Sequence, residues 1–207
     1  MEETKTKKSS GWNSNKTFTV VGMGLMTAIV VVLQLFASGI HVGPFSITLA
    51  LAPIVIGAAI FGWKAGGWLG FVFSVVVLFQ PDTQTFMAFS IPATIAVVLI
   101  KGTVAGLVAG FVYNAVSKKN KLAAVITAGI ASPVVNSGIF AIGCFAFFLP
   151  IVESLSSLLG YEGVVATVFL GLIGLNFLVE LGINLVLASA IVMIINVVTK
   201  RIMKNPS

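Results

Sequence analysis

Charged residues are scarce in this chain, and their scarcity argues against a soluble globular protein. Only 9% of its 207 residues are charged, 58% are hydrophobic, and the mean hydropathy is +1.11. Soluble domains carry about 25% charged residues. A water-soluble fold of this size cannot hide so much apolar surface, and the excess would cause aggregation. The composition therefore predicts an integral membrane protein.

Cysteine, histidine and nucleotide-binding motifs are also nearly absent. With one cysteine and one histidine, the chain offers no internal disulfide and little basis for a metal site or histidine-based catalysis. It contains no G-x-x-x-x-G-K-[ST] and so no P-loop for ATP. No cofactor is expected in this chain, and Cys144 is interpreted as a small core residue.

The few charges divide the chain into apolar segments long enough to cross a bilayer. We predict an all-α bundle of six transmembrane helices, at about 17–38, 46–62, 65–79, 91–117, 122–149 and 164–198. Residues 80–85 and 150–163 are expected to form loops, the second with a short interfacial helix. Pro133 is expected to kink the fifth helix.

Two polar tails flank this membrane domain. Residues 1–16 are predicted to be a flexible cytoplasmic tail, 17–200 the six-helix domain, and 201–207 a second cytoplasmic tail. A signal peptide is the competing interpretation of the first apolar segment. That segment is longer than a typical signal-peptide core, so we expect a retained helix.

The basic residues of this topology gather on one side. They are Lys5, Lys7, Lys8, Lys16, Lys64, Lys118, Lys119, Lys121, Lys200, Arg201 and Lys204, whereas the opposite loops hold Asp82, Glu153 and Glu162. By the positive-inside rule, both termini are predicted to be cytoplasmic. The net charge of +6 is explained by contact with anionic lipid, because the basic clusters lie beside apolar segments, and no nucleic-acid partner is expected.

Lys101 and Glu180 are the charges that this topology does not explain. Each is predicted to lie at membrane depth, where a charge costs about 2.5–3.5 kcal/mol on insertion scales, so both should face the bundle interior. One interpretation is that they pair and hold two helices together. The other is that they line a polar pocket and contact a ligand, with or without pairing to each other.

Further amides lie at the same depth. Asn176, Glu180 and Asn184 follow one another at i, i+4 and i+8, which places them on one helix face. With Lys101, Asn136 and Gln34 they would surround a small polar molecule. Each amide alone can instead form a hydrogen bond that holds two helices together. His41 and Gln84, in the outer loops, are either solvated side chains or gate residues that contact the ligand. Few aromatic residues accompany this polar stripe, which disfavours a flat-ring ligand such as a flavin or pterin.

Small residues recur every fourth position along several expected helices. Such stripes let membrane helices approach closely. The longest runs are Ala58, Gly62, Gly66, Gly70 and Ser74, and Gly102, Gly106 and Gly110. Gly24 and Ala28, near the cytoplasmic end of the first helix, are candidates for docking another protein.

Residues 43–73, G-P-F-S-I-T-L-A-L-A-P-I-V-I-G-A-A-I-F-G-W-K-A-G-G-W-L-G-F-V-F, resemble the substrate-binding components of energy-coupling factor (ECF) transporters. K-G-T-V-A-G-L-V-A-G at 101–110, N-S-G-I-F at 136–140 and N-F-L-V-E-L-G-I-N at 176–184 add to the resemblance. Pantothenate-type members are the most similar. Family members carry A-x-x-x-A on the first helix, where this chain has G-x-x-x-A at Gly24 and Ala28.

The resemblance implies a non-enzymatic, multi-pass vitamin-binding subunit of a bacterial cytoplasmic membrane. Its partners would be a transmembrane coupling subunit and two cytoplasmic ATPases, which carry the ATP and Mg²⁺. Pantothenate fits best, because Lys101 can take its carboxylate. Pyridoxine, folate, thiamine precursors and riboflavin stay open as ligands. A channel would need a continuous polar path, and an enzyme would need a nucleophile–base pair. A purely structural protein would have no use for costly charges at membrane depth.

Overall fold

The computed structural model describes residues 14–42, 45–46 and 48–204, and the side chains of 17–40 and 48–197. The helices are α1 (Ser14–Ala37), α2 (Leu51–Phe61), α3 (Trp63–Leu78), α4 (Pro81–Phe89), α5 (Ile91–Ser117), α6 (Lys121–Phe147), α7 (Leu149–Leu159), α8 (Val164–Ala166), the π-helix η1 (Thr167–Gly174) and α9 (Leu175–Lys204). Strands β1 (His41–Val42) and β2 (Phe45–Ser46) pair antiparallel, with His41 opposite Ser46. The described fold is all-α apart from this short hairpin, as its composition predicts.

Among the residues that the structure describes, four helical stretches are long and apolar enough to cross a membrane, and a fifth results if α3 and α4 count as one broken span. The four are Thr17–Ala37, Ile91–Ser117, Lys121–Phe147 and Val164–Val197. α2 has only 11 residues, which is short for a crossing. Large exposed apolar side chains cover the outside, and Phe79 and Phe111 are 78% and 69% exposed. This surface suits lipid, and the chain is an integral membrane protein.

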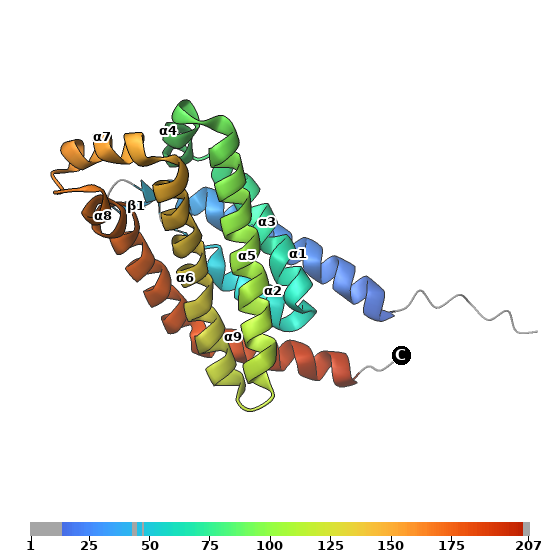
Figure 1. Cartoon of the computed structure of the whole chain (residues 1–207). Helices are drawn as coiled ribbons and strands as arrows, with labels where there is room; N and C mark the ends of the chain where they lie inside the picture. The colour runs from blue at the N-terminus through green and yellow to red at the C-terminus, as the bar shows by residue number, and fades with distance from the viewer. Residues whose placement is uncertain (1–13, 43–44, 47, 205–207) are drawn as a thin grey trace, which may run out of the picture.

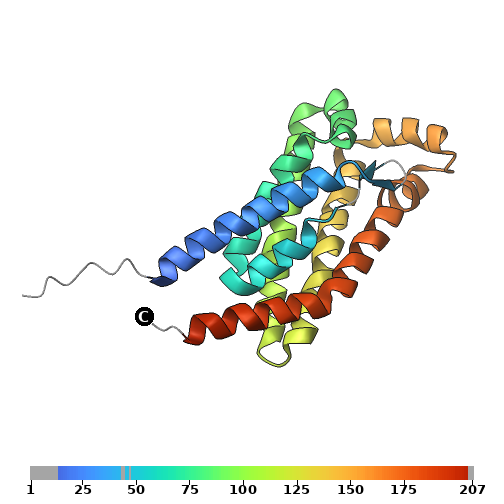
Figure 2. The ribbon, with the colours of Figure 1, turned by 180° about the vertical axis from the view of Figure 1, so that it is seen from behind.

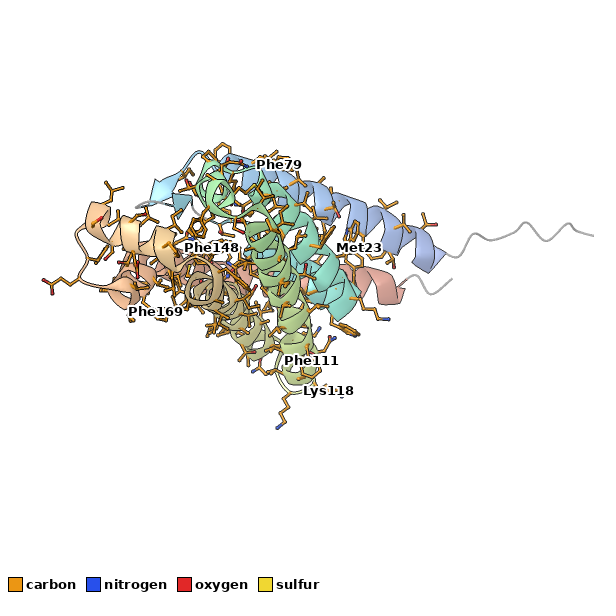
Figure 3. All side chains as sticks on the ribbon, turned by 45° about the horizontal axis from the view of Figure 1, so that its top comes forward. Met23, Phe79, Phe111, Lys118, Phe148 and Phe169 are labelled. Carbon is orange, nitrogen blue, oxygen red and sulfur yellow. The ribbon has the colours of Figure 1, made fainter. Side chains whose placement is uncertain are left out.

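The long helices α5 and α6 stand side by side at the centre and are joined by a tight turn (Figure 1). α4 and α7 cover one end of the bundle, and this turn lies at the other. The start of α1 and the end of α9 lie near each other, away from α4 and α7, and α9 bends along its length (Figure 2). In Figure 3, Lys118 projects from the turn and Phe79 points outward near α4.

Two expected loops are helices. Residues 80–85 belong to α4, which meets α3 at an angle of 77°. Pro81 at its first position and Asp82 in its first turn are good helix starters, so the loop prediction was wrong. Most of 150–163 forms α7, which lies across the end of the bundle (Figure 1). It is longer than the short helix predicted there. The second expected helix, 46–62, begins only at Leu51.

The small-residue stripes pack α3 against α5. A Cβ atom built on Gly66 would collide with the carbonyl oxygen of Gly106, and one on Gly70 with that of Gly102. Gly62 joins α2 to α3 with φ of 94°, a conformation that L side chains rarely adopt. The predicted role in close helix packing is confirmed for Gly66, Gly70, Gly102 and Gly106, whereas Gly62 serves the junction between two helices.

Candidate functional site

The clearest cavity lies near the α4 and α7 end of the bundle. It contains about 720 Å³ of space between atoms, part of it open to the surface. Its lining residues come from five helices, from η1, from the segment before α2 and from the residues that precede α4 and α7: Thr48, Phe73, Val77, Gln80, Asp82, Thr83, Phe86, Thr94, Val97, Val98, Lys101, Asn136, Ser137, Phe140, Phe148, Leu172, Ile173 and Asn176. Half of these lining residues are polar or charged and half are apolar, and a pocket with convergent polar groups suits a small polar molecule.

Three of the predicted site residues meet in this pocket, namely Lys101, Asn136 and Asn176. Their depths agree. At 1.5 Å per residue, Lys101 lies about 15 Å from the start of α5, and Asn136 about 16 Å from the end of α6. Both positions fall near the middle of a hydrocarbon core of about 30 Å.

Lys101 is the cation of the pocket. It is only partly buried, and its Nζ lies 5.1 Å from the centroid of the Phe140 ring, a cation–π arrangement. Glu180 and Asp82 are among its electrostatic neighbours. Lys101 and Glu180 make no direct ion pair within the part of the chain that the structure describes. A ligand carboxylate can therefore bind Lys101 without first displacing the carboxylate of Glu180.

Glu180 lies behind the pocket wall and does not line the cavity. It is 1% exposed, and its Oε1 accepts a hydrogen bond of 3.2 Å from Nδ2 of Asn176. Thr48 is a further neighbour of the carboxylate. Three buried oxygens here have no hydrogen-bond partner among the described residues: Oε2 of Glu180, Oδ1 of Asn176 and Oδ1 of Asn136. Unpaired buried acceptors are rare in native proteins and need an explanation.

The remaining predicted site residues stay outside the cavity. Asn184 donates a 3.2 Å hydrogen bond to the carbonyl oxygen of Gly129. Gln34 is buried in α1 and does not line the pocket. Gln84 is exposed, and its Nε2 donates to the carbonyl of Leu78 at 2.8 Å. The side chain of His41 lies outside the described residues.

Several pocket residues were not predicted. Thr48, Gln80, Thr83, Thr94 and Ser137 are common in loops and helix ends, so their residue types alone signal little. Four phenylalanines also line the cavity: Phe73, Phe86, Phe140 and Phe148. The expectation that few aromatic rings lie beside the polar groups was therefore wrong. These rings come from α3, α4, α6 and the residue before α7, and no local pattern connects them.

An apolar cluster closes the bundle on the side away from α4 and α7. It comprises Ala52, Val55, Ala109, Tyr113, Ala124, Val125, Ala128, Ala188, Ile191 and Ile195. Its members come from α2, α5, α6 and α9 and pack together without a polar group other than the Tyr113 hydroxyl. This arrangement suits a closed pocket and argues against a channel.

The described residues offer no metal centre, since no group of three or more His, Cys, Asp or Glu side chains comes together among them. Cys144 is fully buried and free, in an apolar cluster with Phe148 and Val152. On α1, Gly24 and Ala28 are exposed, and nothing lies within 4 Å of a Cβ built on Gly24. Ala28, with Ile29, Val32 and Leu33, also lines a shallow apolar groove on this helix.

The chain resembles known proteins along nearly its whole length. A family profile described as "ECF transporter, substrate-specific component" matches residues 18–195. The pantothenic acid transporter PanT of Lactococcus lactis subsp. cremoris is 31% identical over 196 residues, which cover 86% of this chain and 93% of that protein. No solved structure matches the chain. The matched region contains every pocket residue named above.

Proposed function

Because the chain belongs to the family of ECF transporter substrate-specific components, we propose that it binds pantothenate as the vitamin-binding subunit of an ATP-driven uptake transporter. The observation that carries this ligand is Lys101, a cation held at membrane depth in a pocket of otherwise uncharged or acidic residues. A charge so placed is costly and marks a functional site. The name of the PanT relative supports the same ligand.

Pantothenate matches the pocket group by group. Its carboxylate pairs with Lys101 in a charge-assisted hydrogen bond. Its two hydroxyls and amide N–H supply donors, for which Asn136 and Asn176 have unpaired oxygen acceptors. Its branched aliphatic part contacts apolar wall residues such as Val97 and Leu172.

We further propose six crossings with both termini in the cytoplasm of a bacterium. α1, α3, α5, α6 and the stretch from α8 to α9 supply five. α2 covers about 16 Å, roughly half of the hydrocarbon core, and the segment before it completes the sixth. The described residues just before α2 suit this role, because Thr48 and Ala50 are buried inside the protein and Thr48 lines the pocket. The pocket then faces outward, and Lys64 and the 118–121 cluster face the cytoplasm.

The partners proposed for this subunit are a transmembrane coupling protein and two cytoplasmic ATPases, because the matching family is the substrate-specific component of a larger transporter. Gly24 and Ala28 on α1 form the proposed docking face for the coupling protein, because both are exposed small residues on a membrane helix. The chain binds and presents its ligand, and ATP hydrolysis takes place on the partners.

A different vitamin is the second candidate. The four phenylalanines of the pocket can stack on a flat ring, which would suit riboflavin or folate. The first experiment is equilibrium binding of radiolabelled pantothenate, riboflavin, folate, pyridoxine and thiamine to the purified full chain in detergent. Tight one-to-one binding of pantothenate alone supports the proposal. Tight binding of another vitamin contradicts the ligand and keeps the family role.

A further inference from the structure

The pocket wall contributed by α6 and α9 displays hydrogen-bond acceptors. Oδ1 of Asn136 and Oδ1 of Asn176 are both buried, both unpaired among the described residues, and both belong to pocket-lining side chains. A buried acceptor without a donor costs free energy, so such atoms persist where another molecule completes them. A ligand that reaches this wall must therefore bring donors.

The orientation of the Asn176 amide explains why this side chain offers an oxygen. An amide has a donor end and an acceptor end. Nδ2 of Asn176 donates to Oε1 of Glu180 at 3.2 Å, so the donor end is already used. Glu180 sits one helical turn further along α9 and is 1% exposed, so water does not replace this contact. The acceptor end is the one left for a ligand.

We propose that Glu180 sets the ligand specificity of the pocket by holding the amide of Asn176 so that its oxygen, beside that of Asn136, faces hydroxyl and N–H donors. Glu180 is thus a positioning residue that acts through Asn176 and does not touch the ligand. This inference rests on the proposed function and deepens it, because it names the part of pantothenate that the protein recognises.

Two chemical consequences follow for ligands that resemble pantothenate. An analogue in which both hydroxyls are replaced by hydrogen leaves buried acceptors unpaired, and each costs about tenfold in affinity. A phosphate monoester of a pantothenate hydroxyl replaces a donor with acceptor oxygens. It also brings negative charge toward Glu180, so its affinity should fall by about 100-fold or more.

The test compares binding of pantothenate, its dideoxy analogue and its phosphate monoester to the full chain and to the Glu180→Gln variant, by calorimetry in detergent. The full chain should prefer pantothenate over both other ligands by the factors given above. In the variant, the new amide can donate to Asn176, so the Asn176 amide is free to turn. The preference for pantothenate over the dideoxy analogue should then fall severalfold. A purely structural role would change all affinities together and leave their ratio alone.

Asn184→Ala is the matched control, since it removes a polar side chain of the same helix that bonds to Gly129 and stays outside the cavity. Its affinity ratio should equal that of the unmodified chain. An unchanged ratio in Glu180→Gln overturns the inference while pantothenate binding still stands. Equal binding of all three ligands to the unmodified chain overturns it without any variant. Absence of pantothenate binding to folded protein overturns the proposed function and this inference with it.

Discussion

The side-chain nitrogen of Asn184 in α9 lies 3.2 Å from the carbonyl oxygen of Gly129 in α6. Gly129 is four residues before Pro133, which lies inside α6 and has no N–H to donate to that carbonyl. Asn184 thus satisfies a backbone acceptor that the proline leaves open. The contact joins α6 to α9 next to the pocket residues of both helices, on the side away from α4 and α7.

Removing this contact should destabilise the fold and leave ligand recognition intact. We expect Asn184→Ala to lower the free energy of unfolding by about 1–2 kcal/mol, because a buried carbonyl loses its donor. Unfolding in detergent, followed by circular dichroism, measures this cost. In a Pro133→Ala background the restored N–H takes over the carbonyl, so the same substitution should cost less. An equal cost in both backgrounds would contradict this account.

Replacement of Lys101 should weaken pantothenate binding strongly. Lys101→Met keeps the apolar stem and removes the charge, so the carboxylate of the ligand loses a charge-assisted bond. We expect a loss between about tenfold and 100-fold in affinity, measured by calorimetry, with an unchanged circular dichroism spectrum. Lys101→Arg keeps the charge and should retain part of the affinity. Unchanged affinity in Lys101→Met would make the lysine structural.

Asp82 should oppose the binding of an anionic ligand. It lines the pocket from α4 and is an electrostatic neighbour of Lys101, so it attracts the lysine and repels a carboxylate. Asp82→Asn is therefore expected to raise pantothenate affinity severalfold at low salt, with a smaller effect at high salt. Glu153→Gln makes the same charge change on the exposed side of α7, outside the cavity, and should leave affinity unchanged. Weaker binding in Asp82→Asn would show that Asp82 helps hold the ligand.

Gly106 should tolerate no added methyl group. A Cβ atom there would collide with the carbonyl oxygen of Gly66 on α3, and backbone cannot move aside cheaply. We expect Gly106→Ala to lower stability by about 1–3 kcal/mol, seen as a lower melting temperature in detergent. Gly138→Ala is the matched control, because nothing lies within 4 Å of its added Cβ. Equal melting temperatures for the two variants would rule out close α3–α5 packing.

Substitutions on α1 should separate binding from transport. Gly24→Leu and Ala28→Leu enlarge exposed residues, and a Cβ on Gly24 meets nothing within 4 Å, so we expect normal folding and pantothenate binding. Uptake by cells expressing the full transporter should fall several-fold, because the bulky side chains keep the coupling protein at a distance. Gly138→Leu, on the exposed side of α6, should spare both. Normal uptake in both α1 variants would remove this face from the docking surface.

The membrane character and most helices were predictable because apolar length is a local property of the sequence. The predicted segment 17–38 corresponds to α1, and 91–117 to α5. The loop predicted at 80–85 failed because its proline and aspartate suit a turn and a helix start equally well. Whether such a segment continues as a helix depends on what it packs against, and α4 packs on α5.

The site was predictable only in part, for a related reason. Lys101, Asn136 and Asn176 stand out because polar groups are costly at membrane depth. Asn176 and Asn184 share one helix face and were expected to share a role, yet one lines the pocket and the other holds Gly129. Spacing along a helix identifies a face, whereas the partner opposite each residue depends on the neighbouring helix. Phe73 and Phe86 resemble ordinary lipid-facing or core residues in sequence, so nothing marked them as pocket walls.

The number of residues in the π-helix Thr167–Gly174 affects the geometry of the pocket, because it fixes how the following helix is rotated. Its i→i+5 bonding places more residues in each turn than an α-helix does, and the stripe that begins at Asn176 follows almost at once. Loss of one residue in this segment would rotate everything after it by about 100° relative to what precedes it. Asn176 follows closely after this segment and lines the cavity together with Asn136 of α6. Insertions and deletions in this segment should therefore change ligand recognition, as point substitutions of pocket residues do.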